Sequence, residues 1–113
     1  MPFINTITNT KISKEQELKI KTRYAQALSI IDKCEAFLML GFNGETSMYF
    51  AGNNSSSMAF VEVKFLGTST EDKLDKLTGA ICQILTEELN IPASKIYVKY
   101  EPTQHWGWNG ANF

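Results

Sequence analysis

Few residues of this 113-residue chain have the types and spacing that catalysis requires. The sequence contains no glycine-rich phosphate loop, no Gly-x-Ser-x-Gly and no His-Glu-x-x-His, and its one histidine, His105, lies in an aromatic tail. Acidic pairs at 71–72 and 87–88 lie at the ends of an expected helix, and a pair in the first turn more often offsets the helix dipole than exchanges protons. The remaining candidate is the proline at position 2.

Pro2 directly follows the initiator methionine, and a small residue there favours removal of that methionine. The mature chain would then begin with a secondary amine, which is a strong base and nucleophile when neutral. An apolar pocket and a nearby cation lower the pKa of such an amine, because both disfavour its charged form. Pro2 could then act as a general base near neutral pH. The alternative is an N-terminus without a chemical role.

The first half of the chain predicts a strand, a helix and a second strand. Residues 3–9 are rich in β-branched types and indicate a strand. Ser13, with a glutamine three residues later, has the spacing of a capping box, and apolar residues then recur at helical spacing to about Asp32. Residues 37–42 form a short apolar run typical of a buried strand, and 47–50 are a candidate for a further short strand.

The second half predicts the same order of elements. Residues 58–66 alternate between apolar and polar types, which indicates a strand with one buried face. Thr68 and Glu71 have capping-box spacing and predict the start of a helix, whose apolar stripe runs over 74–89. Residues 95–101 alternate again and predict the last strand.

These elements predict one domain over residues 1–113, built from two pseudo-repeats at about 2–57 and 58–113. The predicted fold class is α/β in its connectivity and α+β in its mixed sheet. Two βαβ units form one four-stranded mixed sheet with both helices on one face. The other face stays uncovered, and thirteen aromatic residues (two Trp, four Tyr and seven Phe) need burial. A closed symmetric oligomer is therefore expected.

Composition excludes several classes of partner. Eleven Lys and Arg residues against twelve Asp and Glu residues give a net charge of −1, which predicts no nucleic-acid partner and no attraction to anionic membranes. Cys34 and Cys82 have neither metal-ligand nor disulfide-framework spacing, so no metal site is expected. Neither a signal-peptide pattern nor an apolar run long enough to span a membrane is present, so a cytoplasmic location is expected.

Several segments resemble the macrophage migration inhibitory factor family of the tautomerase superfamily, in an order that runs nearly end to end. The resemblance implies a homotrimer whose sheets enclose a central channel, with three active sites at subunit boundaries and no cofactor. The segments that carry it are Met1-Pro-Phe-Ile-Asn-Thr-Ile-Thr-Asn9, Met48-Tyr-Phe-Ala-Gly52, Lys95-Ile-Tyr-Val-Lys-Tyr100, Gly107-Trp-Asn109 and the terminal Phe113.

The same resemblance implies roles for individual residues. Pro2 matches the catalytic base, and Lys33 matches the lysine that binds the substrate carboxylate, although a cation stabilising the end of the helix is the alternative. Phe65 matches a position whose backbone N–H contacts substrate. Tyr97 matches a tyrosine that a neighbouring subunit contributes. Lys99 stands where vertebrate members have asparagine, so it adds a cation that faces the site and leaves the substrate preference open.

Five aromatic residues fall at or near positions of the pocket wall, and packing in the core or between subunits is the alternative for each. They are Phe3, Phe37, Trp106, Trp108 and Phe113.

The function that the resemblance implies is keto–enol tautomerisation of a small aromatic 2-keto acid of the phenylpyruvate type, and of dopachrome-type substrates. The alternative is a cytokine mimic, secreted without a signal peptide, that binds a host receptor and whose pocket is a relic or a contact surface. Ile12 replaces the basic residue of the family's receptor motif while Glu45 keeps its acidic partner, which weakens that alternative. The CxxC of vertebrate members is also absent, so thiol oxidoreductase activity is not expected.

Overall fold

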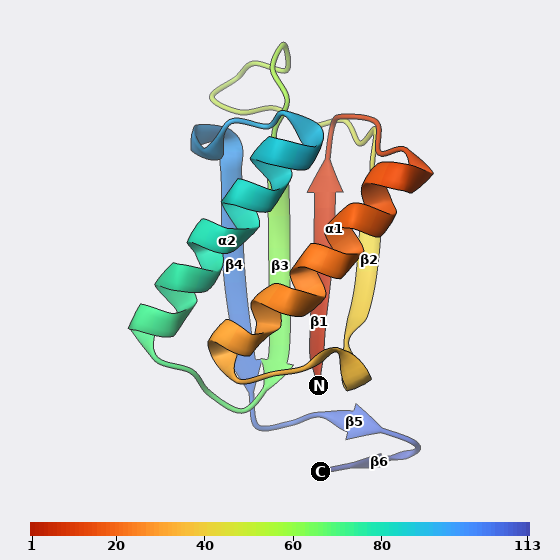
Figure 1. The fold of residues 1–113 in the computed structure, drawn as a ribbon, viewed down its shortest axis with the longest axis vertical. Helices are drawn as coiled ribbons and strands as arrows, with labels where there is room; N and C mark the ends of the chain where they lie inside the picture. Colours follow the sequence, from red (N-terminus) through yellow and green to blue (C-terminus); the bar gives the residue numbers. More distant parts are fainter.

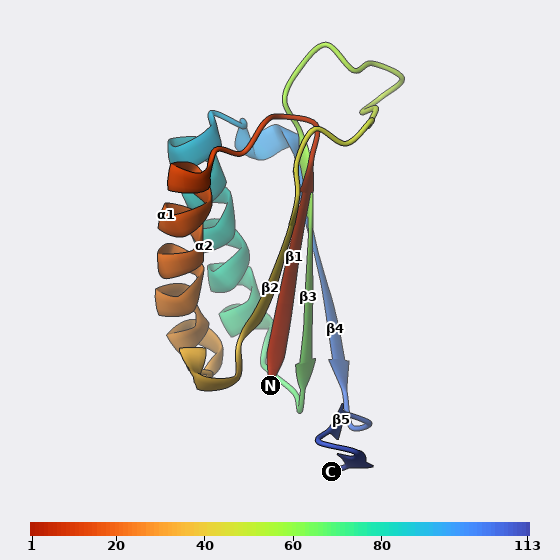
Figure 2. The ribbon, with the colours of Figure 1, turned by 90° about the vertical axis from the view of Figure 1, so that its right-hand side faces the viewer.

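The computed structural model describes residues 1–113 as a four-stranded sheet with two helices packed on one face (Figures 1 and 2). The strand order is β2-β1-β3-β4; the strands are parallel within each βαβ unit, and β1 and β3 pair antiparallel in the centre. The mixed sheet with both helices on one face is therefore confirmed. Its elements are β1 (Pro2–Thr8), α1 (Lys14–Ala27), β2 (Met39–Asn43), β3 (Ala59–Leu66), α2 (Glu71–Leu89) and β4 (Ile96–Thr103).

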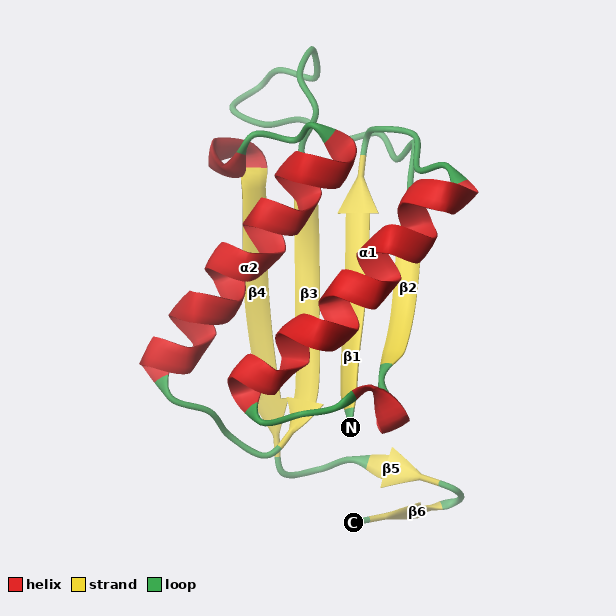
Figure 3. Cartoon of the chain, viewed as in Figure 1, coloured by secondary structure: helices red, strands yellow, loops and turns green.

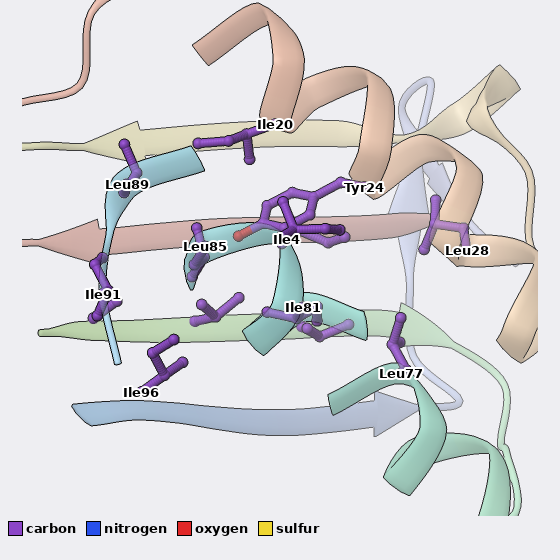
Figure 4. Close-up of a cluster of buried hydrophobic side chains, with 14 of the residues drawn as sticks. Ile4, Ile20, Tyr24, Leu28, Leu77, Ile81, Leu85, Leu89, Ile91 and Ile96 are labelled. Carbon is purple, nitrogen blue, oxygen red and sulfur yellow. The ribbon is translucent and has the colours of Figure 1, made fainter. Parts of the chain in front are cut away.

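The hydrophobic core lies between the sheet and the helices (Figure 4). Alternate residues of β1 and β3 are buried, as the period of two in the sequence predicts. The helices contribute the stripes expected from their periodicity, with Ile20 and Tyr24 on α1 and Leu77, Ile81 and Leu85 on α2 each at most 1% exposed. This packing fixes which sheet face is left uncovered.

The helix starts were predicted with mixed success. Ser13 caps α1 in the expected capping box, and its hydroxyl accepts a hydrogen bond from the Gln16 N–H. The prediction of Thr68 as the cap of α2 is wrong, because Thr70 caps this helix and its side chain accepts from the Lys73 N–H. A run of hydroxyl residues after β3 offers more than one cap, and spacing to an acidic residue alone did not distinguish them.

Two boundaries in the first half also differ from expectation. The helix predicted to reach Asp32 is α-helical only to Ala27 and continues as the 3-10 turn η1 (Leu28–Ile31) before Asp32 takes a left-handed conformation. The strand predicted to begin at residue 37 begins only at Met39, because the residues before it form a 3-10 turn, η2 (Glu35–Phe37). The candidate strand over 47–50 is wrong, because its only pairing is an isolated bridge from Phe50 to Asn53.

A short hairpin follows β4 and lies beyond one end of the sheet, close to the N-terminus (Figure 3). It consists of β5 (Gly107–Trp108) and β6 (Ala111–Asn112), joined by Asn109 and Gly110, which both have positive φ. This is the two-residue turn that an Asn-Gly sequence favours. The remaining turn, η3 (Ala93–Lys95), leads into β4 at the opposite end of the sheet, and none of the helices is long and apolar enough to cross a membrane.

The uncovered face of the sheet is polar in its middle. The Asn5 amide donates to Glu62 at 3.1 Å, and Glu62 lies 3.6 Å from the Lys64 ammonium. On β4, Lys99 and Glu101 form a further ion pair at 3.6 Å. Large apolar side chains are therefore concentrated at the two ends of the sheet rather than over its centre.

Candidate functional site

Pro2 lies in an apolar hollow at the end of the sheet that faces the β5–β6 hairpin. The residue is buried, and it pairs with Phe65 across the antiparallel β1–β3 ladder. The volume of the hollow is about 420 Å³, which is in the range of small-molecule sites. We call it the Pro2 hollow; its lining residues are Met1, Pro2, Phe3, Ala36, Phe37, Leu38, Met39, Trp106, Gly107 and Trp108.

Lys33 reaches the same end of the sheet from the segment after η1. Its half-buried ammonium donates to the carbonyl oxygen of Leu66 at 2.9 Å and lies 5.8 Å from the centre of the Phe65 ring. The Gly67 backbone, with φ of 102°, lies next to this ammonium, and a Cβ at that position would be 3.7 Å from Nζ. One carbonyl uses one of the three N–H donors of an ammonium, so Lys33 retains donors for an anion.

The free amine at this end of the chain is that of Met1, which is joined to the Pro2 nitrogen by a peptide bond. Burial lowers the pKa of this amine, the Lys33 charge lowers it further, and Cys34 acts in the opposite direction. An amine in this place is thus more readily neutral than an ordinary N-terminus. A neutral amine beside an apolar cavity can take a proton from carbon, while a nearby ammonium can hold an anionic group.

Aromatic rings form one wall of the Pro2 hollow. Phe37 and Trp108 pack edge to face with ring centres 6.0 Å apart, and Phe113 stacks on Trp108 at 6.2 Å. The Phe113 N–H donates to the Trp106 carbonyl, which ties the end of the chain to the hairpin. Phe3, Phe37, Trp106 and Trp108 line the hollow directly, whereas Phe113 lies behind Trp108.

Phe65 and Lys99 are placed differently from the residues that line the Pro2 hollow. Phe65 is 0% exposed as a whole residue, so neither its ring nor its backbone is open to a ligand in this structure. Lys99 lies on the uncovered face, opposite Glu62 and paired with Glu101.

Tyr97 is also far from Pro2 within one chain. Pro2 pairs with Phe65 and Tyr97 pairs with Phe60, so they are separated by five residues of β3, or about 16 Å. Tyr97 lies instead in a second apolar hollow of about 310 Å³ at the opposite end of the sheet. We call it the Tyr97 hollow; its lining residues are Met48, Tyr49, Phe50, Met58, Ala59, Phe60, Lys95 and Tyr97.

Sequence reasoning missed several residues of these two hollows. Met39 lines the Pro2 hollow because it lies beside Phe3 in the parallel β1–β2 pair, and only the register reveals that relation. Phe50 and Lys95 contact each other in the Tyr97 hollow, although 45 positions separate them in the sequence. No group of three or more His, Cys, Asp or Glu side chains converges on a point where it could hold a metal ion.

Comparison with known proteins places this geometry in a family. The family model described as macrophage migration inhibitory factor (MIF) matches residues 1–113. Leishmania major MIF2 is 33% identical with a TM-score of 0.92, covering 100% of this chain and 97% of that one. The homologue from Prochlorococcus marinus is 26% identical with a TM-score of 0.87, and 98% of each chain is covered.

A match to the Xenopus laevis macrophage migration inhibitory factor is shorter. It is 31% identical over 64 residues, which span 55% of this chain and 56% of that relative. The fold is also shared with the Toxoplasma gondii protein, at 19% identity and a TM-score of 0.89 over 98% of this chain and 99% of that one. From the family match over its whole length and the Leishmania likeness, the chain belongs to the macrophage migration inhibitory factor family of the tautomerase superfamily.

Proposed function

We propose that the protein is a cofactor-independent keto–enol tautomerase of phenylpyruvate-type substrates, and of dopachrome-type substrates, with Pro2 as general base once Met1 is removed. The observation that carries this proposal is that Pro2 is buried in an apolar hollow at the N-terminus. Burial and the Lys33 charge both lower the pKa of the N-terminal amine there. An aromatic wall and a cation suit a substrate that has an aromatic ring and a carboxylate.

The reaction moves one proton and changes no oxidation state overall. The neutral Pro2 amine takes a proton from the carbon beside the keto group, and the electron pair left behind forms the carbon–carbon double bond of the enol. The protonated Pro2 amine then gives that proton to the former carbonyl oxygen, which completes the enol and restores the neutral base. Because the carbonyl makes the adjacent C–H acidic, the proposed step proceeds without a cofactor. Lys33 holds the carboxylate, and Lys99 adds a second cation when it is brought to the site.

The complete site is proposed to form in a homotrimer, in which Tyr97 of one copy faces Pro2 of the next. Seven large apolar residues are exposed on one chain, and all except Leu18 lie at one of the two hollows or stack on their walls. Exposed apolar surface that is gathered in two patches indicates contact with another protein. A ring of copies would cover both patches at once.

The test compares Pro2→Gly with the unchanged protein, both with Met1 removed and both checked by mass spectrometry. Phenylpyruvate enolisation is followed by ultraviolet absorbance, and dopachrome conversion by loss of its colour. General-base catalysis contributes about 10²- to 10⁴-fold, so we expect kcat/KM to fall by about 100-fold or more. A preparation that retains Met1 is a second control, and it should be equally weak because its Pro2 nitrogen is an amide. Unchanged turnover in Pro2→Gly would overturn the mechanism.

The receptor-binding alternative has less support. Ile12, at the position of the basic receptor residue, packs against the hydrophobic core and does not present a charge. Receptor binding that survives Pro2→Gly would nevertheless separate that activity from catalysis.

A further inference from the structure

The Tyr97 side chain is largely open to solvent, with 59% of the residue exposed. Two other aromatic rings pack against it. The centre of the Tyr97 ring lies 5.4 Å from the centre of the Phe50 ring, with the planes tilted by 48°, and 6.5 Å from that of Phe60, edge to face. Phe60 is the strand neighbour of Tyr97 and follows from the sheet register. Phe50 comes from the long loop between β2 and β3, and no sheet pairing places it there.

A two-residue turn fixes the position of Phe50. The Phe50 N–H donates to the Asn53 carbonyl at 2.8 Å, and the Asn53 N–H donates back at 3.0 Å. Ala51 and Gly52 between them have φ of 50° and 78°, which is the pattern of a tight hairpin turn. The Asn53 side-chain oxygen accepts from both the N–H and the hydroxyl of Ser55, which stiffens the turn further.

A cation also contacts the Phe50 ring. The Lys95 ammonium lies 4.5 Å from the ring centre, a distance at which the attraction between a cation and an aromatic face is strong. Lys95 forms none of the salt bridges in the structure, so this ring is its principal partner. It belongs to η3, immediately before the strand that carries Tyr97. Lys95 thereby ties the loop to the base of β4.

We propose that Phe50 and Lys95 are positioning residues that set the orientation of Tyr97 for the neighbouring copy's Pro2 site. This proposal rests on the proposed function. The phenol of Tyr97 must be presented to a substrate bound beside Pro2 of another copy, and an exposed tyrosine without side support would sample several rotamers. The turn at 50–53 holds Phe50 in place, Phe50 supports the Tyr97 ring, and Lys95 keeps Phe50 against β4.

The kinetic test is a double-mutant cycle in the Met1-free protein. Phe50→Leu keeps an apolar side chain of the loop but removes the ring, and Phe50→Tyr restores a ring. Aromatic pairs contribute enough to predict a loss of about 3- to 10-fold in kcat/KM for Phe50→Leu, with recovery in Phe50→Tyr. In a Tyr97→Phe background, which lacks the hydroxyl to be placed, the loss should shrink to less than about 2-fold.

Lys95→Met provides a variant that leaves every aromatic ring in place. We expect it to lower kcat/KM by about 2- to 5-fold, from the usual strength of an exposed cation–π contact. Lys76→Met, which removes an exposed lysine on α2, is the matched control and should leave kcat/KM unchanged. Sedimentation velocity of every variant shows whether assembly is preserved; if Phe50→Leu alters it, Lys95→Met carries the kinetic test.

A spectroscopic readout tests the orientation without catalysis. Ring protons of labelled tyrosine are assigned to Tyr97 by their loss in Tyr97→Phe. Lys95→Met leaves both rings in place, so it should shift these signals only by changing how the Phe50 and Tyr97 rings lie against each other. Unmoved Tyr97 signals, an equal kinetic loss in both backgrounds, or no effect of Tyr97→Phe on activity would each overturn the positioning role. If Pro2→Gly abolishes turnover while Phe50 and Tyr97 are uncoupled, only this inference fails; if Pro2→Gly remains active, the proposed function fails and the ring signals still decide the orientation.

Discussion

β3 holds Pro2 and Lys33 at the same end of the sheet, although they belong to different parts of the chain. Pro2 pairs with Phe65, and the Lys33 ammonium donates to the carbonyl of the next residue, Leu66. The cation is therefore fixed to the strand that also holds the proline. A charge that is anchored in this way can affect both the basicity of the amine and the binding of an anionic substrate.

Lys33→Met is predicted to change two kinetic quantities at once. The Lys33 charge lowers the pKa of the Met1 amine, and we expect the same direction for the Pro2 amine after Met1 is removed. Loss of the charge should raise that pKa, so the acidic limb of the profile of kcat/KM against pH should move to higher pH. Loss of a charged hydrogen bond to the carboxylate should also lower kcat/KM for phenylpyruvate by about 10- to 100-fold.

The methyl ester of the substrate separates the two effects of Lys33→Met. It lacks the carboxylate, so the loss in binding should largely disappear while the shift along the pH axis remains. An acidic limb that stays in place would contradict the electrostatic role of Lys33. Thermal unfolding of the variant checks that loss of the bond to Leu66 has not disturbed β3.

At the scale of elements, one polar contact joins α1 to the centre of the sheet. The hydroxyl groups of Thr6 and Tyr24 lie 2.8 Å apart, and both residues are almost completely buried. Burial raises the pKa of the Tyr24 phenol, so the group stays neutral at ordinary pH and the hydrogen bond persists. Because both hydroxyls are buried, water cannot replace a lost partner. Leaving either hydroxyl without a hydrogen bond should therefore lower the stability of the protein considerably.

Removing one of these hydroxyls should destabilise the protein more than removing both. We expect Tyr24→Phe and Thr6→Val each to lower the free energy of unfolding by about 1 to 3 kcal/mol, because each leaves a buried hydroxyl unsatisfied. The double variant should recover much of that loss. Thr22→Val on the exposed face of α1 is the control, and urea unfolding at one fixed protein concentration gives the comparison. Additive losses would show that the pair is not coupled.

The elements themselves could largely be predicted from the sequence, because periodicity reports which face is buried. The stripe of α2 and the alternation of β3 both proved correct. The errors lie where short-range rules compete: three hydroxyl residues follow Gly67, and Thr70 rather than Thr68 caps the helix. The segment 47–50 has strand-like residues, but no partner strand is available to pair with it.

The candidate site was less accessible to sequence reasoning without a family resemblance. The Pro2 hollow gathers residues from β1, η2, β2 and the C-terminal hairpin, and no spacing pattern links these segments. The residue types alone indicated Pro2 as a candidate base. They did not indicate which lysine lies near it or which aromatic residues form the wall of its pocket. The support of Tyr97 by Phe50 depends on a loop conformation, which residue types do not specify.

At the scale of the whole molecule, the two halves place their functional groups at opposite ends. β1 and β2 begin at the Pro2 hollow, whereas β3 and β4 begin at the Tyr97 hollow, because β1 and β3 are antiparallel. One copy therefore presents the amine at one end and the phenol at the other. A site that requires both groups must draw on two copies.

Mixing two inactive variants should restore activity if the site is shared. Pro2→Gly and Tyr97→Ala each disable one contribution, and in mixed trimers some sites combine the intact Pro2 of one copy with the intact Tyr97 of its neighbour. For equal amounts assembled at random in a closed ring, about a quarter of the sites should be complete. Activity is measured after the two variants are refolded together, with each refolded alone as its control. Absence of recovery, or a monomer in sedimentation, would contradict the shared site.

The antiparallel pairing of β1 with β3 gives the chain an approximate twofold axis between these strands, and this axis exchanges the two hollows. One hollow contains Pro2 and the other, at the matching place, contains Ala59. The two βαβ units therefore have unlike ends, one with the N-terminal proline and one with the phenol of Tyr97. When unlike ends join head to tail, each contact uses one of each, so a closed ring leaves no half-site unmatched.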